Sequence, residues 1–152
     1  MIHKTQLLSN LPAQHTERLM RTAREVSFPA GTRIFKEGHR AHHFWILRTG
    51  SVALDSHVPG RSAPVVETLG NGELLGWSWL FRPYQWHLGA RAVSDVTAYE
   101  FDAVVVRALL KDDPVLDAAV TRYVAEVVSQ RLKATRMRLL HLYGPYGNAP
   151  RP

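Results

Sequence analysis

Hydrophobic and polar positions follow two different periods in this chain, and the change falls near Asp102. Between Val26 and Gly76, apolar residues come in short or alternating runs such as "FWIL" and "SVALDSHV", separated by turn signals such as Pro29-Ala30-Gly31. Short runs with a turn about every 10 residues are typical of a β-sandwich or barrel. The run "ARAVSDVTAYEFDA" at 90–103 predicts a further pair of strands.

Helical patterns lie on both sides of these strands. Spaced leucines over Thr5–Val26, interrupted by a proline, predict one or two short helices. Asp102 precedes "AVVVRALLKDD" as a helix cap, and Asp113-Pro114 is a typical helix start because proline is tolerated in the first turn. No glycine or proline occurs from Val115 to Tyr143, so one long helix is expected at about 114–143.

The long helix carries a stripe that predicts a partner. Four apolar residues and one threonine recur at alternating spacings of four and three, as in a coiled-coil seam. They are Val128, Leu132, Thr135, Leu139 and Leu142. We expect the N-terminal half of the helix to pack on its own strands and the C-terminal half to pair with a second copy in a homodimer. The alternative is that the whole stripe packs on its own domain.

Composition narrows the class of protein. One domain is expected at 1–143, with a flexible tail at 144–152, since 152 residues suffice for one hydrophobic core. The absence of cysteine excludes disulfides and thiol catalysis. No apolar run approaches the roughly 18 residues of a membrane span, and no signal peptide is recognised, so we expect no membrane association and a cytoplasmic location. The net charge of +6 favours anionic partners.

Candidate chemistry gathers in "GELLGWSWLFRPYQWHLGARAV", the segment Gly72–Val93, called the cassette below. It interleaves three of the four tryptophans with three cationic or titratable side chains. These are Trp77, Trp79, Arg82, Trp86, His87 and Arg91. Aromatic faces beside cations suit a planar or apolar ligand that carries an acid group. The alternative is that the tryptophans fill a cavity that no longer binds anything.

The order of elements resembles the cyclic nucleotide-binding domain of the Crp/Fnr regulator family. The resemblance rests on "FPAGTRIFKEG" at 28–38, "FWILRTGSVAL" at 44–54, "LGNGELLGWSWLF" at 69–81, "ARAVSDVTAYEFD" at 90–102 and "RLKATRMRLLHLYG" at 131–144. It implies an α+β fold, a β-roll or jelly roll with short N-terminal helices and a long C-terminal dimerisation helix. It also implies tight turns with positive φ at Gly31, Gly38, Gly50, Gly72 and Gly76.

The resemblance also implies where a ligand would lie. The family places a sugar-binding glutamate where this chain has Trp77, and a phosphate-binding arginine near Trp86-His87. Indole is a hydrogen-bond donor only, so Trp77 cannot replace the glutamate. We therefore expect a small anionic ligand rather than cyclic AMP in the usual mode, held by Arg82, His87 or Arg91. Thr135 matches a position that contacts the purine base in the family; alternatively, it is only a seam residue.

Several other patterns are given ordinary interpretations. His39, His42 and His43 are taken as solvated turn residues rather than metal ligands. The basic side chains of the long helix are taken as a solvated face; they are Arg131, Lys133, Arg136 and Arg138. No catalytic motif is recognised, so no enzyme activity is expected, and no cofactor is assigned. The chain ends soon after the long helix, so we expect no sequence-specific DNA binding by this chain alone.

Two functions follow from these observations. The first is a single-domain sensory or regulatory module that binds a small anionic ligand and responds through its long helix. The second is a scaffold or partner-binding subunit whose pocket is plugged and vestigial, in which case a protein partner replaces the ligand.

Overall fold

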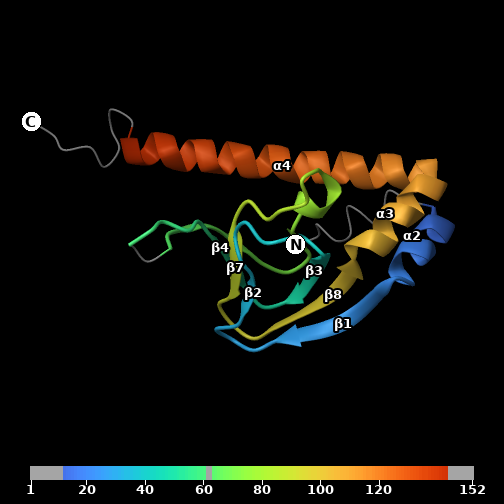
Figure 1. Ribbon diagram of the computed structural model, residues 1–152, viewed down its shortest axis with the longest axis horizontal. Coiled ribbons are helices and arrows are strands. Elements are labelled where there is room, and N and C mark those ends of the chain that lie inside the picture. Colours follow the sequence, from blue (N-terminus) through green and yellow to red (C-terminus); the bar gives the residue numbers. More distant parts are fainter. Residues whose placement is uncertain (1–11, 61–62, 144–152) are drawn as a thin grey trace, which may run out of the picture.

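The computed structural model describes residues 12–60 and 63–143 of the chain. Within these ranges, eight strands form a β-roll of two four-stranded antiparallel sheets, and a long helix runs along one side of the roll (Figure 1). This confirms the predicted α+β fold with a long C-terminal helix. The tail predicted at 144–152 lies outside the described residues.

The two sheets are built from strands that are far apart in the sequence. The first sheet has the order β1-β8-β3-β6, with bounds Ala23–Phe28, Val96–Asp102, His43–Thr49 and Leu74–Leu75. The second has the order β2-β7-β4-β5, with bounds Arg33–Phe35, Gly89–Ala92, Val52–Asp55 and Val65–Leu69. The pair of strands predicted at 90–103 is present as β7 and β8, one in each sheet.

Within the described ranges, three α-helices flank the roll. They are α2 at Ala13–Met20, α3 at Ala103–Asp112 and α4 at Pro114–Tyr143. The helical prediction is wrong beyond Met20, because Ala23–Phe28 pairs with β8 along its whole length and is extended. A helix predicted before Pro12 lies outside the described residues. The span of α4 agrees with the prediction.

Both predicted helix starts are present, and an aspartate caps each of them. The carboxylate of Asp102 accepts hydrogen bonds from the backbone N–H groups of Val104 and Val105 at 2.9 and 3.2 Å. The carboxylate of Asp113 accepts from the Leu116 N–H at 3.0 Å. These bonds satisfy donors that the first turn of a helix leaves unpaired, so each aspartate defines where its helix begins.

The core fills the space between the sheets and the first half of α4. It includes Phe44, Phe101 and Trp79, whose rings stack with centroid separations of 4.1 and 4.7 Å. The five predicted turn glycines all have positive φ. At Gly50 the space is closed as well, since a Cβ would lie 2.2 Å from the Asp95 carbonyl oxygen. No helix in the described ranges is long and apolar enough to span a membrane.

Candidate ligand-binding site

A cavity of about 250 Å³ opens between the second sheet, the cassette and α4. Its wall is mostly apolar and aromatic, with a few polar groups among them. It is lined by Phe35, Leu54, Val66, Glu67, Gly76, Trp77, Ser78, Trp86, His87, Leu88, Val128, Arg131, Leu132 and Thr135. Pockets of this character hold organic ligands by shape and fix their orientation through a few polar contacts.

Trp77 and His87 form one aromatic wall of the cavity. Their rings stack with centroids 4.7 Å apart and planes inclined by 25°. A hydrogen bond of 3.0 Å joins Ser78 Oγ to His87 Nδ1 and fixes the orientation of the imidazole. Trp77 therefore borders the cavity as the sequence predicts, and it presents an indole face beside a titratable ring.

Trp86 forms a second wall and is itself nearly inaccessible. Its exposed fraction is 5%, and its ring stacks on Phe35 with a centroid separation of 3.8 Å. Gly76, with φ of 95°, lies against this indole, and a Cβ there would be 2.7 Å from two ring carbons. Only glycine tolerates both that φ and that contact, so Gly76 allows the cassette to close over Trp86.

Arg131 of α4 supplies the guanidinium in the cavity wall. Its Nη2 donates a hydrogen bond to the Leu74 carbonyl oxygen at the end of β6. Burial lowers the pKa of Arg131, and the nearby Glu67 and Glu73 offset part of that effect. The interpretation of Arg131 as part of a solvated basic face is therefore wrong, because this side chain is directed to the β-roll rather than to solvent.

Glu67 of β5 is the carboxylate that borders the cavity. Burial raises the pKa of Glu67, Arg131 lowers it, and Glu73 raises it further. Arg131 has five N–H donors, so its bond to Leu74 leaves donors that Glu67 or an added acid could occupy. The wall thus offers one cation with spare donors beside a carboxylate that is partly desolvated.

Three residues predicted for the site do not line the cavity. Trp79 has an exposed fraction of 0%, stacks on Phe44 and donates its Nε1 to the Gly76 carbonyl at 3.2 Å, so it belongs to the core. Arg82 is exposed, with its guanidinium 6.0 Å from the Tyr84 ring centroid. Arg91 lies between Ala90 and Ala92, both fully buried, so strand alternation directs it to the opposite face of the sheet.

The seam residues divide between the cavity and the surface. Val128, Leu132 and Thr135 line the cavity, and Val128 also packs against the core. Leu139 is exposed, and the Leu142 side chain lies outside the described part. In the described ranges no cluster of histidine and carboxylate side chains is arranged to hold a metal ion.

Sequence reasoning missed Arg131 although a signal was available. Arg131 lies three residues after Val128 and four before Thr135, so all three share one face of a helix. A polar residue that shares a helix face with Val128 and Thr135 is expected to point in the same direction as they do. The overall basic character of 131–138 concealed this.

Comparison with known proteins identifies the fold family. The sequence model of the cyclic nucleotide-binding domain matches residues 25–113, more than half of the chain. The chain belongs to the cyclic nucleotide-binding domain family. A CRP-like cAMP-activated global transcriptional regulator from Mycobacterium tuberculosis is 24% identical over 124 residues, which are 82% of this chain and 54% of that protein. The chain thus spans about half the length of this curated relative.

Solved structures agree with this assignment. A protein of Geobacter metallireducens GS-15, described as a cyclic nucleotide-binding protein, superposes with a TM-score of 0.75 at 26% identity and covers 84% of this chain and 92% of that one. A cyclic nucleotide-binding domain from Methylobacillus flagellatus KT superposes with a TM-score of 0.79 at 14% identity, covering 91% and 83%. The cassette, which lies within the matched residues 25–113, therefore belongs to a domain that is homologous to CRP-like regulators.

Proposed function

We propose that this domain is a regulatory sensor that binds a small, largely apolar ligand carrying one acid group. The ligand would occupy the cavity between the cassette and α4, with its flat body against Trp77 and its acid group on Arg131. The observation that carries the proposal is the guanidinium of Arg131 in a wall that is mostly aromatic and apolar. A desolvated cation interacts strongly with an acid, whereas water would screen the same pair at the surface.

The residues of this site do not suit cyclic AMP bound in the family's usual mode. Trp77 stands where the family has its sugar-binding glutamate, and an indole cannot accept a hydrogen bond from a ribose hydroxyl. The family's phosphate-binding arginine falls near Trp86-His87, and neither of these residues is an arginine. Trp86 is packed against Phe35, and its indole N–H carries no positive charge to pair with a phosphate. Glu67 also disfavours a ligand with several negative charges, so a single carboxylate or a sulfonate fits best.

The response is proposed to pass through α4 to a second copy of the chain. Leu132 lines the cavity and yet has an exposed fraction of 68%. A partner helix packed on Leu132 would close the cavity, so ligand binding and helix pairing would favour each other. Further along α4, Leu139 and Leu140 are exposed at 56% and 53% and extend the same apolar surface.

A regulatory role in the cytoplasm belongs to the same proposal. The curated relative is named as a transcriptional regulator, and such proteins act where the DNA is. The support for regulation rather than catalysis is this kinship together with the absence of a recognised catalytic motif in the sequence.

One observation favours the second candidate, a scaffold with a vestigial pocket. Trp86 fills space at the cavity wall with a buried indole, which is what the loss of a ligand would permit. In that case Trp77 and Arg131 serve only to attach the cassette and α4 to the roll.

Binding of 8-anilinonaphthalene-1-sulfonate tests the proposal, since this dye has a flat apolar body and one anionic group. Arg131→Gln should weaken dye binding by about 10- to 150-fold, the effect of losing a charge-assisted hydrogen bond of about 1.5–3 kcal/mol. Arg136→Gln is the matched control, because Arg136 is exposed on the same helix. Fluorescence titration gives the affinities, and thermal unfolding verifies that both variants fold.

Equal dye affinity in wild type and Arg131→Gln would reject Arg131 as the anion site. If the dye and a library of aromatic carboxylates all leave fluorescence and melting temperature unchanged, the scaffold function is the better one. Trp77→Ala provides a second variant, expected to weaken the dye less than Arg131→Gln because it removes stacking but keeps the cation.

A further inference from the structure

A second concave surface lies on the other side of the Phe35–Trp86 stack. These two rings line both the cavity described above and an open groove of about 460 Å³, called the basic groove below. The groove is lined by Phe28, Arg33, Ile34, Phe35, Lys36, His39, Arg40, His42, His43, Trp45, Trp86 and Glu100. It therefore combines a floor of aromatic rings with a rim of basic and titratable side chains.

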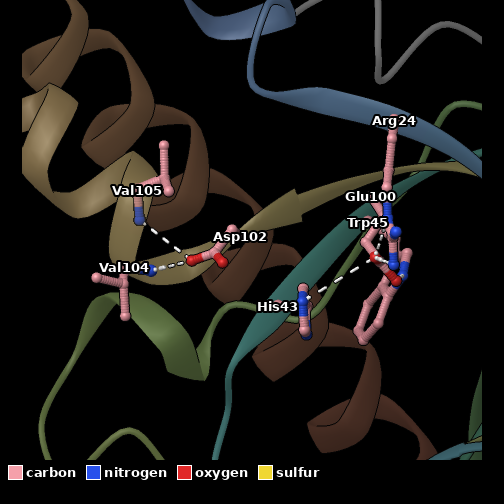
Figure 2. A network of polar contacts seen from close by, with 7 residues as sticks. All are labelled: Arg24, His43, Trp45, Glu100, Asp102, Val104 and Val105. Atoms are coloured by element: carbon pink, nitrogen blue, oxygen red, sulfur yellow. Dashed lines mark hydrogen bonds and ion pairs between the residues drawn. The ribbon is translucent and has the colours of Figure 1, made fainter.

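The acidic side chain of the groove is already neutralised by partners. Figure 2 shows Arg24, His43 and Trp45 converging on Glu100: Arg24 Nη2 and Trp45 Nε1 lie 2.7 and 3.0 Å from its carboxylate oxygens, and His43 Nε2 lies at 4.0 Å. Because Glu100 is buried and saturated, it adds little negative potential to the groove.

The remaining basic and titratable side chains of the groove fall into two groups. Arg33 donates two hydrogen bonds, of 2.8 and 2.9 Å, to the buried Asp55 and is thereby compensated. The others project from the loop between β2 and β3 and are exposed. Within the described ranges no carboxylate forms an ion pair with them; they are Lys36, His39, Arg40 and His42. The groove thus carries uncompensated positive charge.

We propose that the basic groove is a docking site for an acidic, extended peptide segment of a protein partner. A single exposed ion pair changes an affinity by only about 1.4- to 5-fold, so one small anion would gain little there. A segment with several carboxylates and one aromatic or apolar anchor can use the cations and the aromatic floor together. A second copy of this chain is a poor occupant, because each copy has a net charge of +6.

Backbone hydrogen bonds connect the loop that carries the basic groove to the cassette. Gly38 N–H donates to the Trp86 carbonyl at 2.8 Å, Trp86 N–H donates to the His39 carbonyl at 2.9 Å, and Ala41 N–H donates to the Tyr84 carbonyl at 2.7 Å. A peptide held by the basic loop therefore rests on the segment that carries Trp86. The proposal itself does not depend on the cavity having a ligand.

The test is fluorescence anisotropy with a short labelled peptide of aspartate and glutamate that contains one central phenylalanine. Lys36→Gln combined with Arg40→Gln should weaken binding by about 2- to 30-fold, the sum of two exposed pairs. Lys111→Gln combined with Arg122→Gln removes the same charge from exposed positions on α3 and α4, and it should bind as the wild type does. All four positions are exposed, and thermal unfolding verifies that the variants fold.

Three results would overturn the proposal. One is an anisotropy that does not change up to about 1 mM peptide. Another is an equal loss of affinity in the two double variants, which would mean that net charge alone attracts the peptide. A third is inorganic pyrophosphate binding as tightly as the peptide and competing with it, which would make the groove a small-anion site.

A peptide with serine in place of phenylalanine should bind more weakly, because the aromatic floor loses its contact.

Discussion

The two halves of α4 both carry large apolar residues but place them in opposite environments. In the first half, Leu116, Val120 and Val124 have exposed fractions of 0%, 3% and 1% and pack into the core. In the second half, Leu132 and Leu139 are exposed at 68% and 56%. One continuous helix thus passes from the interior of the domain to solvent, with the cavity at the transition.

This difference identifies where the domain ends and where a partner surface begins. A helix of 30 residues is about 45 Å long, which exceeds what this β-roll covers. Apolar residues in the covered half stabilise the monomer, whereas leucines in the uncovered half gain nothing until another surface packs on them. Since the helix is continuous, a change of packing at one half reaches the other without an intervening hinge.

The largest expected effect comes from the buried half. Leu116→Ala should lower the free energy of unfolding by about 2–5 kcal/mol, because it removes core contacts and leaves a cavity. Leu140→Ala, at 53% exposure on the same helix, should change it by less than about 0.5 kcal/mol in the monomer. Urea denaturation at low protein concentration measures both, and similar losses in the two variants would contradict the division of α4.

The second prediction concerns association through the exposed half. Leu139→Asp should convert a dimer into monomers at tens of micromolar, because pairing would bury an unpaired carboxylate. Val104→Asp is the control, since it places the same charge on another exposed apolar residue, on α3 rather than α4. Light scattering gives the molecular mass of each protein. A wild-type protein that is already monomeric at this concentration would contradict the proposed helix pairing.

Much of the fold could be predicted from local signals. Asp102 and Asp113 cap the helices they precede, and the absence of glycine and proline after Val115 extends α4 to Tyr143. Positive φ at the turn glycines follows from tight connections between short strands. These features depend on neighbours within a few residues, which is why the sequence alone suffices to predict them.

The candidate site was less predictable, because side-chain direction depends on tertiary packing. Its place in the cassette predicts that Arg91 binds the ligand, but Ala90 and Ala92 on either side of it are buried, so Arg91 lies on the opposite face of the sheet. Its residue type predicts that Trp79 lies in the pocket, but its ring stacks on Phe44 in the core. Arg131 lies among several basic residues of α4, and its hydrogen bond to the Leu74 carbonyl of β6 is a tertiary contact that the exposed Arg136 does not share.

The smallest expected effect is a pH-dependent change in melting temperature on substitution of Asp113, the residue before α4. Asp113 accepts hydrogen bonds from Leu116 N–H at 3.0 Å, from Arg18 Nη1 at 2.9 Å, and lies 2.7 Å from His15 Nδ1. The bond from the Leu116 backbone holds the pKa of Asp113 below its ordinary value of 3.8, and His15 and Arg18 act in the same direction. Asp113 therefore anchors both α2 and the buried half of α4.

The sign of the pH effect follows from that lowered pKa. The unfolded chain binds a proton at Asp113 at a higher pH than the folded chain does, so stability rises with pH in this window. The contribution is complete above the ordinary value of 3.8 and is lost as pH falls through the folded pKa. Asp113→Asn should lower the melting temperature at pH 7, and its difference from wild type should shrink below about pH 4. Asp112→Asn, an exposed neighbour, should show neither effect, and a pH-independent deficit in Asp113→Asn would mean that the carboxylate's charge does not anchor α4.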